Sequence, residues 1–207
     1  MKKSLMYIFV FFIFLTSCKK QVDNCIKTTF YSQDSLYKIT FDKPIELDTL
    51  YRWLDADCTP CGEDYKYRYS KKNYPLLKES GWIKGPEPDS IYQITFRHVN
   101  KFQCKTENIL NSQELVNVMK NKWKYERATI DTIFIKDKEI NGFNYNIIGY
   151  ILNENYDNKY LTHVFKIWTI MDGYRLDFTA ECKSNKCKDF IERMEKSFQT
   201  IEIEKLK

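Results

Sequence analysis

The second half of the chain contains four successive runs rich in strand-forming residues, and the first of them alternates hydrophobic and polar positions. These runs cover residues 129–136, 143–152, 161–171 and 174–180. Alternation with a period of two is typical of strands that bury one face, and β-branched and aromatic residues favour strands. Asn141-Gly142 and Asp172-Gly173 separate neighbouring runs, and both pairs favour tight hairpin turns. The pattern predicts a four-stranded antiparallel meander.

A hydrophobic repeat of three to four residues before the meander predicts a helix over residues 111–123. Its apolar stripe consists of Leu115, Val116, Met119 and Trp123. Asn111 can cap the first turn, and Glu114 follows at the spacing of a capping box. We interpret the stripe as a surface that faces the core rather than one that lines a ligand groove.

A second helical repeat follows the meander over residues 187–200, and Ser184 or Asn185 is placed to cap its start. Its apolar stripe consists of Phe190, Ile191, Met194 and Phe198. Because such a stripe must be buried, we expect this helix to pack on the meander. Residues 201–203 predict a short edge strand after the helix.

Residues 30–108 follow a less regular pattern that is rich in strand-forming residues. Segments 37–41, 65–69 and 91–99 read as strands, and a Gly- and Pro-rich loop at 81–88 precedes the last of them. Together with residues 109–207, they predict a single α+β domain. We expect an antiparallel sheet with packed helices, stabilised by disulfides.

The first residues have the layout of an export signal. Two lysines precede an apolar run at residues 5–15, and small residues follow. The run has eleven residues, whereas a membrane-spanning helix needs about 20. We therefore interpret residues 1–17 as a signal peptide that is removed.

The signal ends in Leu15-Thr16-Ser17-Cys18, which resembles the lipobox of bacterial lipoproteins. The resemblance implies cleavage before Cys18, a diacylglycerol on its thiol and an acyl chain such as palmitate on its amino group. The alternative is an ordinary signal peptide followed by a cysteine. Lys19 stands where an Asp would imply inner-membrane retention, so the resemblance favours the outer membrane of the bacterial cell envelope.

Removal of residues 1–17 changes the net charge of the protein and leaves a tether between the lipidated cysteine and the folded domain. Loss of Lys2 and Lys3 lowers the net charge from +5 to +3, which is too small to indicate a nucleic-acid partner. Residues 18–29 are polar and without periodicity, so we interpret them as the lipidated cysteine and a tether. As a flexible coil the tether spans roughly 17–20 Å. The expected partners are the lipid bilayer, through the acyl chains, and an envelope or secreted protein.

Six further cysteines remain in the exported part of the chain. They are Cys25, Cys58, Cys61, Cys104, Cys182 and Cys187. An even number in an exported domain indicates disulfides, but sequence leaves their pairing open. We expect a local Cys182–Cys187 bridge, because these two close a short loop between a strand and a helix. Zinc held by the four cysteines at 58, 61, 182 and 187 is the alternative, and an oxidising compartment disfavours it.

Cys58-Thr59-Pro60-Cys61 resembles the redox centre of thioredoxin-like proteins. In that family the first cysteine lies at a helix N-terminus, which lowers its pKa. Here acidic residues surround the motif, and they would raise a thiol pKa. We therefore interpret the motif as a structural turn, and we keep a periplasmic thiol–disulfide enzyme using Cys58 and Cys61 as the alternative function.

No other catalytic or metal-binding constellation stands out in the sequence. The only histidines are His98 and His163, and neither has a partner at a metal-binding offset. We therefore expect neither enzymatic activity nor a cofactor or metal.

The fifteen tyrosines suggest a binding role. The candidate partner surface consists of Tyr65, Tyr67, Tyr69, Trp82 and Tyr92, while the alternative is that these aromatics form ordinary core pairs.

The order of elements from Leu115 to Ile203 resembles the PsbP-like fold, which occurs in several small exported lipoproteins. The resemblance consists of a helix, a long antiparallel meander and a last helix that ends Lys196-Ser197-Phe198 before an extended segment. It implies an accessory or binding factor rather than an enzyme. The sequence therefore predicts a membrane-anchored, non-enzymatic module that is part of an envelope complex or neutralises a toxin.

Overall fold

The structure is a computed structural model. It describes residues 24–32, 35–55, 64–72, 90–100, 111–125, 128–154 and 161–206. Two antiparallel sheets and two helices make up this described part, so the fold is mostly β rather than a balanced α+β mixture.

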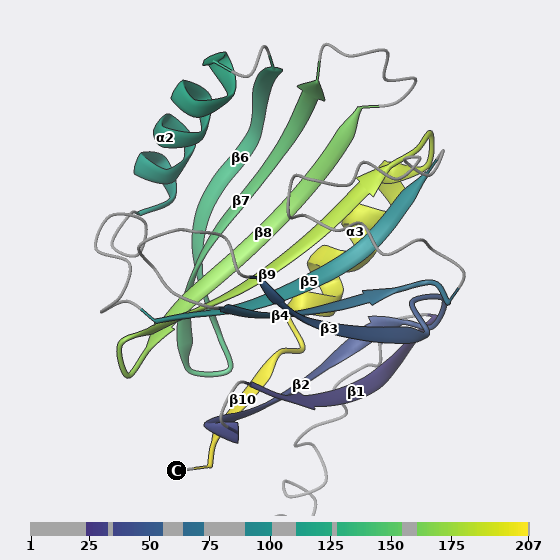
Figure 1. The fold of residues 1–207 in the computed structure, drawn as a ribbon, viewed down its shortest axis with the longest axis vertical. Coiled ribbons are helices and arrows are strands. Elements are labelled where there is room, and N and C mark those ends of the chain that lie inside the picture. Colours follow the sequence, from purple (N-terminus) through teal and green to yellow (C-terminus); the bar gives the residue numbers. More distant parts are fainter. Residues whose placement is uncertain are drawn as a thin grey trace, which may run out of the picture.

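The larger sheet has seven strands in the order β3-β4-β5-β9-β8-β7-β6 (Figure 1). Its strands are β3 (Thr49–Asp55), β4 (Asp64–Ser70), β5 (Ile91–Asn100), β6 (Ala128–Ile140), β7 (Phe143–Glu154), β8 (Thr162–Met171) and β9 (Tyr174–Lys183). The four consecutive strands β6 to β9 form the meander that the sequence predicts. β5 pairs with the far edge of that meander and joins the two halves of the chain into one sheet.

The smaller sheet and the two helices complete the described fold. Its strands are β1 (Cys25–Tyr31), β2 (Tyr37–Pro44) and β10 (Glu202–Lys205), in the order β1-β2-β10. The helices are α2 (Ser112–Tyr125) and α3 (Cys187–Phe198). β10 confirms the predicted edge strand and ties the C-terminal end of the chain to its N-terminal hairpin.

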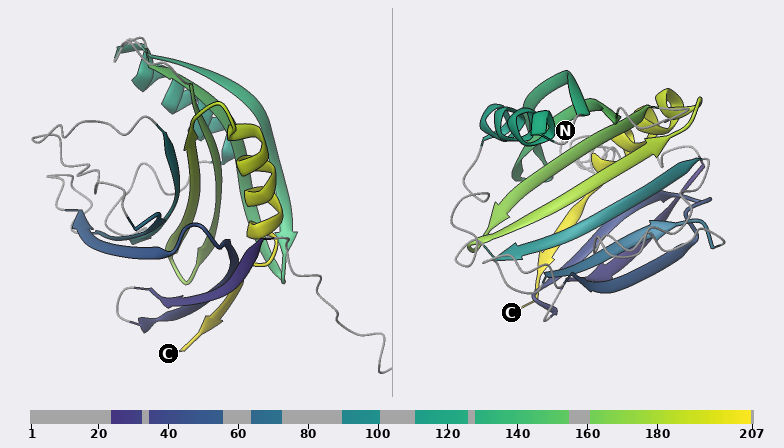
Figure 2. Two further views of the ribbon diagram at one scale, coloured as in Figure 1. Left: turned by 90° about the vertical axis from the view of Figure 1, so that its right-hand side faces the viewer. Right: turned by 45° about the horizontal axis from the view of Figure 1, so that its top comes forward.

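The core lies between the inner face of the larger sheet and a layer formed by α3 and the smaller sheet. The larger sheet curves around α3 (Figure 2). Phe178 of β9 packs against the rings of Phe41, Phe96 and Phe198, with centroid distances of 6.4, 5.0 and 5.9 Å. These rings come from β2, β5, β9 and α3, so a single aromatic cluster joins both sheets to the helix.

α2 packs on the opposite, outer face of the larger sheet. Val116 contacts Ile148 of β7 and Trp168 of β8 in a separate buried cluster. The predicted capping box is present: the Asn111 backbone N–H donates to Glu114 Oε2 at 3.0 Å, and the Glu114 N–H donates to Asn111 Oδ1 at 2.9 Å. Local sequence therefore fixes the start of α2, and Leu115, Val116 and Met119 of its predicted apolar stripe pack against the sheet as expected.

Both predicted hairpin turns of the meander are confirmed. Asn141 and Gly142 have φ angles of 49° and 84°, and Asp172 and Gly173 have φ angles of 48° and 90°. Two successive positive φ angles match the twist of the flanking strands. Asn and Asp tolerate this conformation, and Gly adopts it without steric cost.

Three local predictions require correction. Residues 25–29, which the prediction assigned to the tether, belong to a strand, since β1 begins at Cys25 and pairs with β2. β3 was not predicted from the sequence, and the structure shows it as a strand that pairs with β4 along its whole length. Neither Ser184 nor Asn185 is the N-cap of α3. Lys186 holds that position without a side-chain bond.

Gly149 of β7 lies opposite Phe134 of β6, next to an irregularity in the pairing of these two strands. A Cβ atom at residue 149 would lie 2.5 Å from Cε1 and 2.8 Å from Cζ of the Phe134 ring. We expect Gly149→Ala to lower the free energy of unfolding by about 1–3 kcal/mol through overpacking. Urea denaturation measures this loss. In a Phe134→Leu background the same substitution should cost less, and an equal cost would contradict the contact.

Candidate functional site

The outer face of the larger sheet changes from apolar to charged across its strands. Beside α2, strands β7 and β8 present Ile148, Tyr150 and Trp168. Strands β4 and β9 and the middle of β5 (residues 93–97) instead place polar residues at alternate positions along the strand, all on this same face. We call the charged part the cationic face and define it by Lys66, Arg68, Arg97, Lys166, Arg175 and Asp177.

Asp177 lies at the centre of the cationic face and is only 2% exposed. Its Oδ2 atom accepts from Lys166 Nζ at 3.1 Å and from Arg175 Nη2 at 2.9 Å. Its Oδ1 atom lies 2.8 Å from Arg175 Nε. Arg97 stands directly opposite Asp177 across the β5–β9 pair. One carboxylate therefore holds two cations in direct contact, with a third on the neighbouring strand.

Burial and neighbouring charges act against each other in this group. Burial raises the pKa of Asp177, but Lys166 and Arg175 outweigh it and hold that pKa below its usual value. Burial lowers the pKa of Lys166, and the charges of Arg175 and Arg97 lower it further, against the raising effect of Asp177. Burial is the largest of these effects on Lys166, so its pKa lies below the usual value even though Asp177 is in contact with it.

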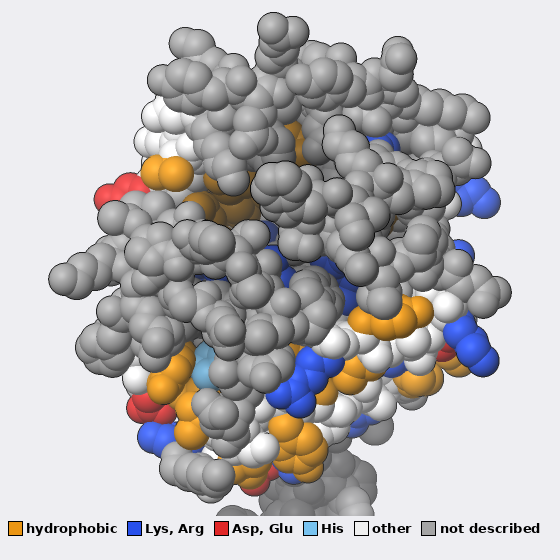
Figure 3. Space-filling view, viewed as in Figure 1, with side chains coloured by type: hydrophobic (Ala, Val, Ile, Leu, Met, Phe, Trp, Pro, Cys, Tyr) orange, Lys and Arg blue, Asp and Glu red, His pale blue; other side chains and the backbone are white. Residues whose placement is uncertain are grey.

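Two threonine side chains lie between the cations. Thr95 of β5 and Thr179 of β9 face each other directly, with Arg68 beyond Thr95 and Lys166 beyond Thr179. Arg68 Nε donates to Thr95 Oγ1 at 3.0 Å, which directs the guanidinium toward the pair. Figure 3 shows Lys and Arg side chains in blue in the middle of this face, visible between the grey atoms.

This arrangement suits the binding of an anion. Guanidinium groups present several N–H donors in a planar fork that matches oxyanions, and the ammonium and hydroxyl groups add further donors. Within the described part of the chain, no cluster of three or more His, Cys, Asp or Glu residues could hold a metal ion.

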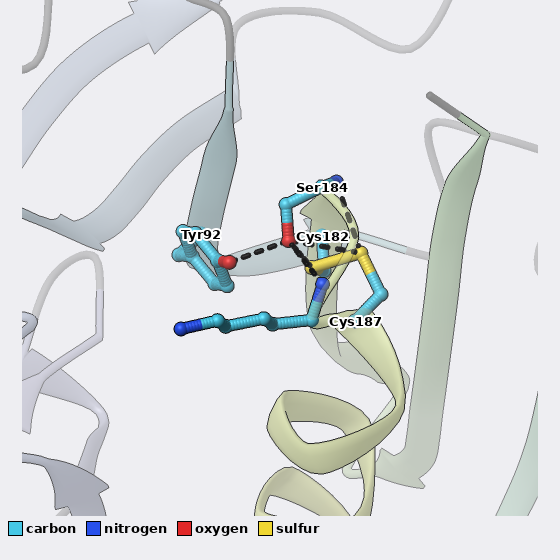
Figure 4. Close-up of a disulfide and its surroundings, with 5 residues drawn as sticks. Tyr92, Cys182, Ser184 and Cys187 are labelled. Carbon is cyan, nitrogen blue, oxygen red and sulfur yellow. Dashed lines mark hydrogen bonds between the residues drawn. A yellow bond between two sulfur atoms is a disulfide. The ribbon is translucent and has the colours of Figure 1, made fainter. Parts of the chain in front are cut away.

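A disulfide closes the turn between β9 and α3. Cys182 and Cys187 are bonded, with their Cα atoms 5.4 Å apart, as the sequence predicts. The Ser184 N–H donates to Cys187 Sγ at 3.2 Å, and Ser184 Oγ accepts from the Lys186 N–H at 3.0 Å (Figure 4). The Tyr92 hydroxyl hydrogen-bonds to Ser184 Oγ, so β5 also supports this turn. Both sulfurs are buried, which indicates a structural role.

We expect the Cys182→Ala/Cys187→Ala double variant to lose about 2 kcal/mol of unfolding free energy, because the bridge closes a short loop in the unfolded chain. Thermal denaturation with and without reductant measures this loss. Reductant should destabilise the wild type more than the variant. An equal response would show that this bridge does not stabilise the domain.

The remaining cysteines divide into two groups. Cys25 begins β1 and is buried, and burial raises the pKa of its thiol to about 11. Cys18, Cys58, Cys61 and Cys104 lie outside the described residues. The lipobox and the Cys-x-Pro-Cys motif therefore stay predictions from sequence.

The described tyrosine side chains of the predicted partner surface pack in or against the core. Tyr67 and Tyr69 are each 5% exposed and lie in the core, because their strand face turns inward against Phe30. Tyr92 is half-buried and packs on Phe190 at a centroid distance of 5.3 Å. Trp82 and the side chain of Tyr65 lie outside the described residues. The described tyrosines thus support the core-pair alternative.

The cationic face was not predicted from the sequence, although a signal for it exists. Polar residues occupy every second position in Gln93-Ile94-Thr95-Phe96-Arg97 and in Arg175-Leu176-Asp177-Phe178-Thr179. This alternation marks one polar face on each strand. Sequence does not show that these two strands are neighbours, which is what gathers the charges.

Comparison with known proteins shows similarity in fold. The structure resembles cyanobacterial PsbP (CyanoP) from Synechocystis sp. PCC 6803, with a TM-score of 0.54, 10% sequence identity, and coverage of 92% of this chain and 99% of the other. A Pseudomonas aeruginosa protein of unknown function, proposed to be a regulator, matches with a TM-score of 0.40 and 8% identity, covering 84% and 94% of the two chains. No protein-family model and no curated protein matches the sequence.

The likeness to PsbP supports the fold predicted from the order of elements. At this level of identity it concerns the fold alone, and function has to be argued from the site. Among the helices that the structure describes, none has the length and apolar character to cross a bilayer.

Proposed function

We propose that the protein is a lipid-anchored, non-enzymatic binding or accessory module of the bacterial envelope, and that it holds an anionic envelope component on its cationic face. The observation that carries this proposal is the concentration of buried positive charge around Asp177 on one face of the larger sheet. Cationic groups gathered on one surface favour association with negatively charged partners.

The anchor part of the proposal rests on the lipobox at Cys18. β1 starts at Cys25, seven positions after Cys18, with six residues between them. At about 3.4 Å per residue, that segment reaches at most about 24 Å. An acylated Cys18 would therefore keep the folded domain close to the bilayer, where envelope components are concentrated.

Co-purification tests whether the cationic face holds an envelope component. The full chain is extracted from envelopes in a neutral detergent, and bound molecules are identified by mass spectrometry. Arg97→Gln removes a half-buried cation of the cationic face. Lys38→Gln is the matched control, because it removes a cation from β2 of the smaller sheet, where Lys38 pairs with Glu204 at 2.8 Å.

We expect the wild type and Lys38→Gln to retain the same component, and Arg97→Gln to retain about tenfold less, as loss of a charge-assisted hydrogen bond implies. Circular dichroism checks that both variants are folded. Absence of any co-purifying component, or equal retention by all three proteins, would contradict the proposal.

A further inference from the structure

Three large apolar side chains are exposed at the end of the smaller sheet where β1 begins. Ile26, Ile45 and Leu50 are 40%, 57% and 42% exposed. Ile26 is the second residue of β1, Ile45 follows the last residue of β2, and Leu50 is the second residue of β3. We call these three residues the apolar rim.

Contacts between the two sheets bring Ile26 and Leu50 to the same place. Ile26 is opposite Lys43 in the β1–β2 pair. Leu50 is opposite Tyr69 in the β3–β4 pair. Lys43 Nζ lies 5.5 Å from the centre of the Tyr69 ring, and the Thr28 and Tyr69 hydroxyl groups are hydrogen-bonded at 3.1 Å. Ile26 and Leu50 therefore flank one point of contact between the sheets.

The polar groups around the apolar rim have partners within the domain. Lys43 is buried, and its Nζ donates to the Leu47 carbonyl oxygen at 2.7 Å. Glu46 forms an ion pair with Arg193 of α3. Asp48 Oδ1 accepts two hydrogen bonds, each of 2.9 Å. A lipid surface can therefore cover the apolar side chains while these bonds stay intact, which avoids the cost of unpaired polar groups.

We propose that the apolar rim lies in the interface of the bilayer to which Cys18 is anchored. This inference rests on the lipid anchor of the proposed function and adds the orientation of the folded domain on the membrane. Six residues lie between Cys18 and Cys25, where β1 starts. The Ile45 N–H donates to the Asn24 carbonyl oxygen at 3.1 Å, directly before β1. The apolar rim thus belongs to the part of the domain nearest the anchor.

The other large apolar side chains that are exposed among the described residues lie elsewhere. They are Tyr31, Val118, Leu161, Ile170 and Leu206. Tyr31 is at the opposite end of β1, about 20 Å from Cys25 along the strand. Val118 is on α2, which packs on the outer face of the larger sheet, away from the smaller sheet. Scattered apolar residues are ordinary on protein surfaces, whereas the apolar rim has a membrane within reach.

The anchor makes even a weak contact effective. Ile and Leu side chains favour lipid over water, and a tether turns their contact with the bilayer into an intramolecular step at high effective concentration. Three side chains would bind a free protein only weakly to a membrane. On an anchored domain they are enough to decide which side faces the bilayer.

Quenching of tryptophan fluorescence by brominated lipid tests the inference on the full, lipidated chain in phosphatidylcholine vesicles. Ile45→Trp places a fluorophore in the apolar rim and keeps it apolar, and tryptophan itself favours the membrane interface. Val118→Trp is the matched control at an exposed position of α2. With brominated acyl chains, we expect the fluorescence that Ile45→Trp adds to the wild type to fall about twofold, and that added by Val118→Trp to stay unchanged.

A further pair of variants tests whether the side chains of the apolar rim make the contact. In the Ile45→Trp background, Ile26→Asn with Leu50→Asn should reduce the quenching. Ile170→Asn is the control, because it makes the same change at an exposed isoleucine of β8 and should leave the quenching as it was. Circular dichroism checks folding, and if the double variant does not fold, the comparison of positions 45 and 118 still decides.

Flotation of the same vesicles separates this step from the anchor. A wild type that does not float with the vesicles would refute the anchor, and the inference with it. A chain that floats while the tryptophans at positions 45 and 118 respond alike, or while the Asn variants of the apolar rim leave the quenching unchanged, would overturn only the proposed orientation.

Discussion

Phe178→Ala is expected to lower the free energy of unfolding by about 3–5 kcal/mol, which is a large part of the stability of an ordinary domain. Phe178 is 0% exposed and contacts aromatic rings from both sheets and from α3. Its removal leaves a cavity where three elements meet, so the surrounding backbone cannot readily collapse into it. Chemical denaturation followed by tyrosine and tryptophan fluorescence measures the loss.

Val118→Ala provides the comparison for this core variant. Val118 lies on α2 and is 46% exposed, so its truncation should change stability by no more than about 0.5 kcal/mol. If Phe178→Ala were as mild as Val118→Ala, the aromatic cluster would not be the main link between the two sheets.

Asp177→Asn is expected to cost about 3–5 kcal/mol in the absence of a bound anion, because it leaves Lys166 and Arg175 buried without the carboxylate that pairs with them. The substitution keeps the size of the side chain, so the loss reports charge rather than packing. Asp172→Asn is the matched control at an exposed ion pair with Lys205, and it should have a much smaller effect. Similar losses for the two variants would contradict the importance of the buried group.

The same carboxylate predicts a pH dependence of stability. Lys166 and Arg175 hold the folded-state pKa of Asp177 below its usual value, despite burial. The unfolded chain therefore binds the proton first, at about pH 3.9, and the stabilising contribution is present above that pH. It is lost as the pH falls through the depressed folded-state pKa. Denaturation of wild type and Asp177→Asn between pH 6 and pH 2 should converge at the acid end, and a constant difference would contradict the assignment.

Local features of the fold could be predicted because they depend on residues close in sequence. The hairpins at Asn141-Gly142 and Asp172-Gly173 need two residues that accept positive φ. The capping box of α2 needs only Asn111 and Glu114. The Cys182–Cys187 disulfide closes a short turn that helix and strand patterns delimit on both sides.

Features that depend on distant pairing could not be predicted. β1 has polar and apolar residues without alternation, and it becomes a strand because β2 pairs with all seven of its residues. Tyr67 and Tyr69 stand on an alternating strand, but only the placement of the smaller sheet decides that their face is the buried one. The cationic face arises because β5 pairs with β9 across more than 70 positions of sequence, which brings Arg97 beside Asp177.

Intact mass spectrometry of the protein purified from membranes tests the membrane-anchored account most directly. We predict a chain that begins at Cys18 and carries the added mass of diacylglycerol and an amide-linked acyl chain, together with acyl labelling that Cys18→Ala abolishes. A mature chain of unmodified mass, or label that persists in Cys18→Ala, would contradict the account.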